Sequence, residues 1–335
     1  MGHGGRGFRR EQSGGQVRVE AEDNGGDLWI SEKASNNLCV KADECFPRKL
    51  CNSLGGQMAS RKTRVLILCK TYPSPSGKHI ETSCVAGMEE DGTLIRLFPV
   101  PFRLIGDDQQ FKKWQWVQVR VDRPPGDQRR ESHKVFVDTI QCEEPPLSTK
   151  KKWRDRRVEI EKIPTLADFM TLELSRQSTG QTLGLVRPSR ILGLDITRSE
   201  KPEWTKEELE KLVQHERQGG LFNDKDEKSI ARLRKLPYDF HYRYACNVNG
   251  VVSEYRHKVV DWEIGALFWN CQRRHGNEWG AAFRDMLEKQ LPAADLIFLM
   301  GNIHRFPDQW LIVSLIYPPK LQQEQLSTRQ LFLDL

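Results

Sequence analysis

Basic side chains lie at alternate positions of a predicted β-hairpin over residues 238–260. Asn249-Gly250 at its centre is typical of a two-residue hairpin turn. Such a turn places Arg243 opposite Arg256, so like charges face each other on one side of the hairpin. They repel there unless the face is solvated, neighbouring carboxylates offset them, or an anion such as a phosphate backbone binds. The residues that we assign to nucleic-acid binding on this face are His241, Arg243, Arg256 and Lys258.

A second basic cluster reads KKKWRDRR over residues 150–157, and six of its eight residues are basic. Lysine and arginine neutralise phosphates, and an indole ring stacks on a nucleic-acid base or packs inward. Because the cluster follows Pro145-Pro146, a solvated linker is the alternative. The residues that the binding interpretation assigns to nucleic acid are Lys150, Lys151, Lys152, Trp153, Arg154, Arg156 and Arg157.

Three carboxylates gather where the predicted hairpin leads into a helix. Asp261 and Glu263 flank Trp262 there, and Glu254 precedes them on the second strand. Carboxylates beside a basic groove suit metal-dependent phosphodiester cleavage, and such a nuclease would use Mg²⁺ or Mn²⁺. The alternative is structural: Asp261 caps the helix and Glu263 complements its dipole.

A zinc site is the third candidate. Cys271 and His275 lie one helical turn apart, which suits tetrahedral Zn²⁺, and Cys246 and His257 would complete the set. However, Cys246 and His257 do not oppose each other in the register that the turn sets. Buried free thiols and ordinary packing therefore stay open as the alternative.

Composition bounds the class of protein. The 335 residues carry 52 basic and 46 acidic side chains, so a basic partner surface must be local. No run approaches the roughly 18 apolar residues of a membrane span, and the first residues lack the apolar core of a secretory signal. These features predict a cytoplasmic protein, no membrane association, and cysteines that stay reduced.

Patterning divides the chain into five parts. The first part is poor in periodic apolar residues and predicts a disordered leader, with Met58 as the candidate start of translation. The predicted parts are a leader over 1–60, a β-rich domain over 62–145, a basic connection with bridging strands over 146–200, an α/β domain over 201–320 and a tail over 321–335.

The predicted fold class is α+β. Short apolar runs, the Asp91-Gly92 turn and proline breaks predict a small barrel or curled sheet first. A capping box at Thr205 and Glu208 predicts a helix, and the last third has the order β-β-α-α-β-β. The expected strands before residue 200 are 64–71, 82–88, 93–100, 116–121, 135–140, 158–163 and one or two within 183–196.

Several stretches are similar to a known family: TYPSPSGKHIETSCVAGM, GTLIRLFPVPFR, FKKWQWVQV, LPYDFHYRYAC, HKVVDWEIG and WLIVSLIYPP. Over residues 64–319 the chain resembles an uncharacterised bacterial family associated with mobile genetic elements and defence regions. That family has no assigned activity, so the resemblance implies no catalytic residue. It implies a start near Met58 and favours nucleic-acid biology.

The leading functional hypothesis is therefore binding of DNA or RNA through phosphate contacts of the two basic clusters. A metal-dependent nuclease is the enzymatic alternative. A subunit without catalysis, whose basic faces contact an acidic protein, is the third class.

Overall fold

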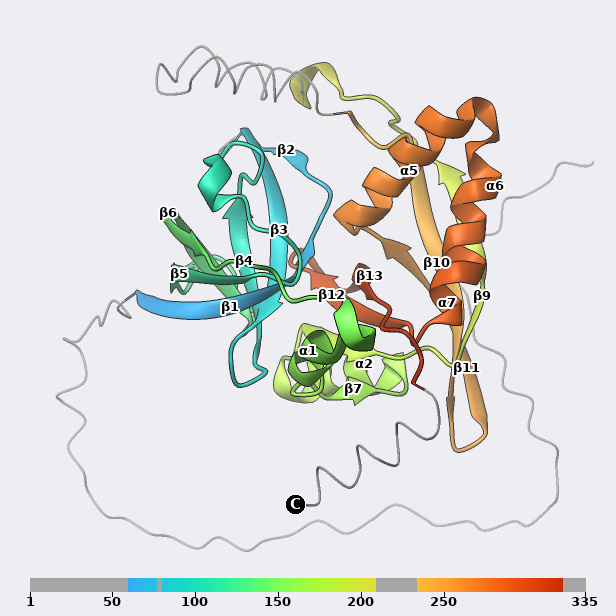
Figure 1. The fold of residues 1–335 in the computed structure, drawn as a ribbon, viewed down its shortest axis with the longest axis horizontal. Helices are drawn as coiled ribbons and strands as arrows, with labels where there is room; N and C mark the ends of the chain where they lie inside the picture. Colours follow the sequence, from blue (N-terminus) through green and yellow to red (C-terminus); the bar gives the residue numbers. More distant parts are fainter. Residues whose placement is uncertain (1–59, 77–79, 209–233, 322–335) are drawn as a thin grey trace, which may run out of the picture. The chain divides into compact units, whose positions relative to one another are not determined.

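The computed structural model describes residues 60–76, 80–208 and 234–321 (Figure 1). The predicted leader up to residue 59, including Met58, and the predicted tail from residue 322 lie outside these ranges.

Five strands close into a barrel in the first half of the chain, which confirms the predicted small barrel. The order is β1-β5-β6-β4-β3, and β3 pairs with β1 to close the ring. β4 and β6 run parallel, and the other pairs are antiparallel. This is the strand order of the five-stranded Greek-key barrel known as the OB-fold. The bounds are β1 (Arg61–Lys70), β2 (Ser74–Ser76), which extends the sheet beside β3, β3 (Ile80–Met88), β4 (Leu94–Val100), η1 (Asp107–Gln109), β5 (Trp116–Asp122) and β6 (Ser132–Cys142).

Alternating side chains fill the barrel. On β5, Val117, Val119 and Val121 point inward and are at most 2% exposed, whereas Gln118 and Arg120 between them point outward. A period of two places alternate residues on opposite faces of a strand, so one face of β5 is core and the other is free to carry polar groups.

The outer wall of β3 and β4 is covered by the second half of the chain. Ala86 and Met88 on β3 pack against Leu185 and Leu299 in one apolar cluster. Arg96 on β4 is only 3% exposed. Its guanidinium donates to the hydroxyl and the carbonyl oxygen of Thr182, at 3.3 Å and 3.2 Å. Buried polar groups need such partners, so this network fixes the barrel against the sheet.

The second half builds a seven-stranded sheet in the order β7-β8-β12-β13-β11-β10-β9. The predicted order β-β-α-α-β-β of the last third is confirmed by β10, β11, the helices that follow, β12 and β13. The one or two bridging strands expected within 183–196 are two, β8 and β9, and they join this sheet. The bounds are β7 (Thr165–Leu166), β8 (Leu183–Val186), β9 (Arg190–Arg198), β10 (Tyr238–Val248), β11 (Val251–Val259), β12 (Ile297–Ile303) and β13 (Phe306–Ile316).

Helices α2, α5 and α6 cover one face of this sheet, and the barrel and α1 pack against the other face. Phe268 on α5 and Phe283 on α6 are fully buried there, against Phe240 of β10. The bounds are α1 (Lys150–Ile160), α2 (Phe169–Thr179), α5 (Trp262–His275), η2 (Gly276–Glu278), α6 (Trp279–Arg284), the wider π-type turns of η3 (Asp285–Gln290) and α7 (Leu291–Ala293).

The strand expected at 158–163 is wrong, because residues 150–160 form helix α1. Ile160 is buried in the apolar cluster between barrel and sheet, and Trp153 packs against the same cluster from the first turn, where Lys151, Lys152 and Trp153 have positive φ angles of 51°, 53° and 65°. The alternating run VEIEKI over residues 158–163 therefore forms the end of helix α1 and the residues that follow it.

The predicted capping box is confirmed, because the side chains of Thr205 and Glu208 each accept a hydrogen bond from the other residue's backbone N–H. Most of the helix expected after it lies outside the described ranges.

None of the helices in the described ranges is both long enough and apolar enough to cross a membrane.

Candidate functional site

The register of the β10–β11 hairpin is confirmed. Val248 pairs with Val251 across the turn, His241 pairs with Lys258, and Arg243 pairs with Arg256. Asn249 and Gly250 have φ angles of 53° and 86°, which a two-residue turn of this type requires. The basic side chains therefore share one face of the sheet.

Carboxylates of the same sheet offset that basic face. Asp195 on β9 accepts a hydrogen bond from the Nε atom of Arg243 at 2.9 Å and of Arg256 at 2.7 Å. Lys258 pairs with Asp239 at 2.7 Å. Burial, and then the nearby Arg256 charge, lowers the pKa of His241, which favours its neutral form. The hairpin's positive charge is thus mostly neutralised within the chain.

The 150–157 cluster separates into inward and outward residues on α1. Trp153 packs edge-on against Trp114, and the guanidinium of Arg156 lies over both rings, 4.9 Å and 4.6 Å from their centroids. Arg157 donates to the carbonyl oxygens of Lys152 and Pro319. The exposed residues of the cluster are Lys150, Lys151, Lys152 and Arg154.

Asp261 and Glu263 meet around a lysine. Asp261 is 3% exposed and caps α5 by accepting from the backbone N–H of Glu263 at 2.8 Å. Its second oxygen accepts from Ser314 and from the backbone of Leu315. Lys113 lies 3.6 Å from Asp261 and 2.9 Å from Glu263. A buried cation therefore occupies the place where a nuclease metal was considered.

Glu254 and the four zinc candidates lie apart from that cluster. Glu254 pairs with Ala245 on the hairpin. Cys246 and His257 lie on the helix-covered face of the hairpin, Cys271 lies on α5, and His275 ends α5. Within residues 60–76, 80–208 and 234–321, no group of three or more His, Cys, Asp or Glu side chains could hold a metal ion.

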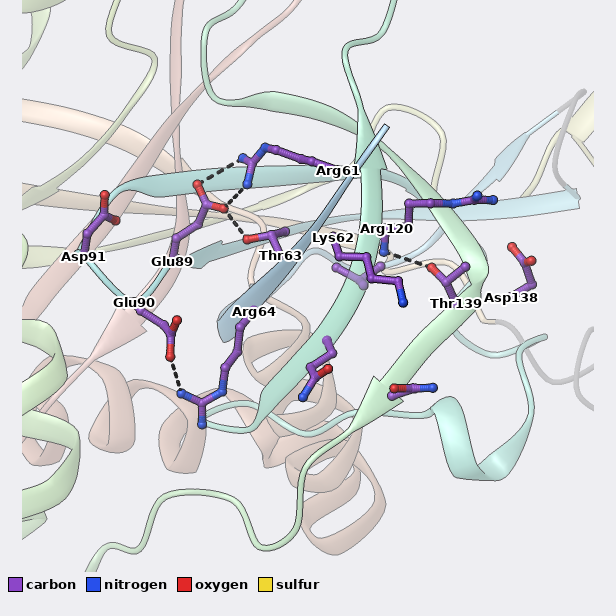
Figure 2. A pocket seen from close by; sticks show the side chains of 13 residues that line it. Arg61, Lys62, Thr63, Arg64, Glu89, Glu90, Asp91, Arg120, Asp138 and Thr139 are labelled. Atoms are coloured by element: carbon purple, nitrogen blue, oxygen red, sulfur yellow. Dashed lines mark hydrogen bonds and ion pairs between the residues drawn. The ribbon is translucent and has the colours of Figure 1, made fainter. Parts of the chain in front are cut away.

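The barrel carries a groove that the sequence analysis did not single out (Figure 2). Its volume is about 810 Å³, and it lies over the outer wall of β1, β5 and β6 beside the β3–β4 turn. Lys62 on β1 pairs with Arg120 on β5, which in turn pairs with Phe136 on β6. The Arg120 guanidinium lies 4.2 Å from the centroid of the Phe136 ring, and the Nζ of Lys134 lies 5.5 Å from it. We call Lys62, Arg120, Lys134 and Phe136 the barrel row; Lys62 and Arg120 line the groove, and Lys134 and Phe136 continue the row on β6 beyond the groove lining.

Two kinds of cation line this groove. Arg61 is paired with Glu89 at 2.5 Å, and Arg64 is paired with Glu90 at 2.8 Å, as Figure 2 shows. The acidic side chains Asp91 and Asp138 line the groove as well. In the described part of the chain, however, no carboxylate lies within 4.0 Å of the cations of the barrel row. The buried Nε of Arg120 has no hydrogen-bond partner there.

The barrel row had a signal in the sequence. The runs WVQVRVD and KVFVD alternate strictly, so their outward positions include Arg120, Lys134 and Phe136. Both strands were predicted, but which of their faces would remain open depends on barrel closure.

Two family models match the chain. A domain of unknown function, DUF8757, matches residues 167–334, and a second, DUF8758, matches residues 61–162. These matches confirm a family without an assigned activity. No curated protein matches. A solved replication protein A heterotrimer bound to single-stranded DNA is similar at 6% identity and a TM-score of 0.24, over 82% of this chain and 68% of that chain.

Proposed function

The chain belongs to DUF8757, a domain of unknown function, and we propose that it binds single-stranded nucleic acid along the open wall of its barrel. The observation that carries the proposal is the barrel row. It combines cations that have no carboxylate partner with an aromatic ring on neighbouring strands.

Each part of the row has a role in such a complex. The ammonium groups of Lys62 and Lys134 neutralise phosphates, which is the main source of affinity for nucleic acids. The guanidinium plane of Arg120 is backed by Phe136, so its other side offers a platform on which an unstacked base packs. Gln118 and Gln141 line the same groove, and their side-chain amides supply hydrogen bonds to base edges.

We place the binding surface on β1, β5 and β6 because the outer wall of β3 and β4 is covered by the second half of the chain. Barrels of this type bind oligonucleotides over their second and third strands. Here those strands are β3 and β4, and their outer wall is buried against the sheet around Arg96 and Thr182. The wall formed by β1, β5 and β6 carries the groove instead. A single strand suits it, because stacking on Arg120 requires a base that is free of its partner.

The exposed residues Lys150, Lys151 and Arg154 of α1 are a second set of cations without an ion pair in the described ranges. We assign them a supporting electrostatic role. The hairpin cations Arg243, Arg256 and Lys258 contribute less, because Asp195 and Asp239 already pair with them.

The test is fluorescence anisotropy of the full chain with labelled single-stranded and double-stranded DNA and RNA of equal length. Arg120→Gln should weaken single-strand binding by about 1–3 kcal/mol, the usual worth of one stacked base. Lys62→Gln should also weaken single-strand binding. Lys289→Gln removes the same charge from η3, where Lys289 is paired with Asp285, and is the matched control.

Wild-type protein that binds no oligonucleotide at low salt would refute the proposal. Equal loss of affinity in Arg120→Gln and Lys289→Gln would also refute it, because the effect would then reflect net charge and not the barrel row.

A further inference from the structure

A small cavity lies between α1 and the barrel-facing side of the sheet. Its volume is about 50 Å³, several times the roughly 10–15 Å³ that one water needs. Its lining combines apolar side chains such as Trp114, Trp153 and Ile160 with polar and charged residues, among them Arg156, Arg157 and Arg187. The cavity shares no lining residue with the barrel groove.

The three guanidinium groups differ in what they bind. Arg187 is paired with Asp295 at 2.9 Å. Arg157 donates to two backbone carbonyl oxygens. Arg156 donates only through Nε, to the carbonyl oxygen of Leu147 at 2.9 Å, so its two terminal nitrogens have no acceptor in the described part of the chain.

Arg156 is therefore a half-buried cation without a counter-ion. No carboxylate lies within 4.0 Å of it in the described ranges, and its plane is held over Trp114 and Trp153. Burial lowers the pKa of Arg156, and the more distant charges of Tyr317 and Glu263 offset this effect only in part. A guanidinium fixed in this way keeps its fork of N–H donors oriented, and that geometry matches two oxygens of a phosphate.

We propose that this cavity binds a phosphate monoester group, held by the terminal nitrogens of Arg156. Thr165 borders the same space, and its hydroxyl would complete the site. Glu161 and Asp295 also line it, and Arg187 neutralises Asp295. The small volume favours a terminal phosphate over a phosphodiester inside a chain, because only a terminal group can enter without carrying two further substituents.

Such a group has two sources, a free phosphate compound or the phosphorylated end of an oligonucleotide. Isothermal titration of the full chain with inorganic phosphate, against sodium chloride at equal ionic strength, tests the first. The second is tested by comparing the affinities of 5′-phosphorylated and 5′-hydroxyl oligonucleotides of the same sequence. We expect phosphate to bind, and the 5′-phosphate to raise affinity on the order of tenfold if the source is an oligonucleotide end.

Arg156→Gln should abolish phosphate binding and bring the affinity ratio of the two oligonucleotides to one. Arg156→Lys should recover only part of it, because lysine lacks the planar fork. Since Arg156 also packs on two tryptophans, Thr165→Val is a second variant that leaves that stacking in place, and it should weaken phosphate binding as well.

Absence of phosphate binding by the wild-type chain, or binding that survives both Arg156→Gln and Thr165→Val, would overturn the assignment. Arg120→Gln should leave phosphate binding unchanged. The phosphate site in the cavity and single-strand binding along the barrel row can thus be refuted independently of each other.

Discussion

Arg243 lies directly opposite Arg256 on the β10–β11 hairpin, and a single carboxylate, that of Asp195 on β9, accepts a hydrogen bond from each. Two like charges directly opposite each other on neighbouring strands would repel. The third strand supplies the compensation within the fold, so the pair does not require an external anion. This relationship is why the barrel row carries the proposed function.

Asp195→Asn should leave both arginines without their carboxylate and increase the positive charge of the hairpin face. The three side chains are between 29% and 50% exposed, so we expect a loss of only about 1 kcal/mol in the free energy of unfolding. Retention on a heparin column should increase, as measured by the salt concentration at elution. Earlier elution than wild type would show that the arginines do not become accessible to a polyanion.

The salt dependence of binding should report the cations of the barrel row. For single strands, each phosphate contact contributes about 0.7 to the slope of log affinity against log salt concentration. Lys62→Gln should therefore make the slope shallower by about 0.7, measured by anisotropy across a salt series. Lys289→Gln should leave the slope unchanged, and a shallower slope in that control would contradict the assignment.

His257 should destabilise the protein in acid. Burial, and then the nearby His241, lowers the pKa of His257 from 6.5 to about 4, and the neutral ring lies 3.1 Å from the hydroxyl of Tyr244. Between pH 6.5 and 4 the unfolded chain takes up a proton that the folded chain refuses, so stability falls as pH falls. At about 1.4 kcal/mol per pKa unit, the loss in the free energy of unfolding reaches about 3 kcal/mol.

Urea unfolding at several pH values would measure this effect. His257→Gln keeps a polar group near Tyr244 but does not titrate, so the stability gap between variant and wild type should change in the variant's favour as pH falls from 6.5 to 4. Parallel pH profiles for the two proteins would contradict the prediction.

Asp261→Ala should be severely destabilising. It removes the cap of α5 and the acceptor of Ser314 and Leu315. It also leaves Lys113, whose side chain is 10% exposed, with Glu263 as its one carboxylate partner in the described part of the chain. Loss of one partner of a buried ion pair costs about 3–5 kcal/mol. Asp261→Asn keeps an acceptor and should cost less, as judged by urea denaturation. A loss of activity in Asp261→Ala would therefore reflect loss of folded protein before it could be read as loss of a catalytic group.

Much of the local structure could be predicted from the sequence. The β10–β11 register followed from Asn249-Gly250, because a two-residue turn sets the pairing of the residues that flank it. The capping box at Thr205 and Glu208 is equally local. Helix α1 was not predicted over 158–163, because its buried side is defined by contacts with Trp114 and Tyr317, which are distant in the chain.

The candidate site was less predictable, because it depends on which surfaces the fold leaves open. The sequence alone determined where strands turn and which side chains alternate, since those properties depend on neighbouring residues. Only the tertiary structure decided that Asp195 meets Arg243 and Arg256, and that Lys62, Arg120 and Phe136 stand in one row. Strand order creates both arrangements, and no short stretch of sequence encodes strand order, because it arises from packing between segments far apart in the chain.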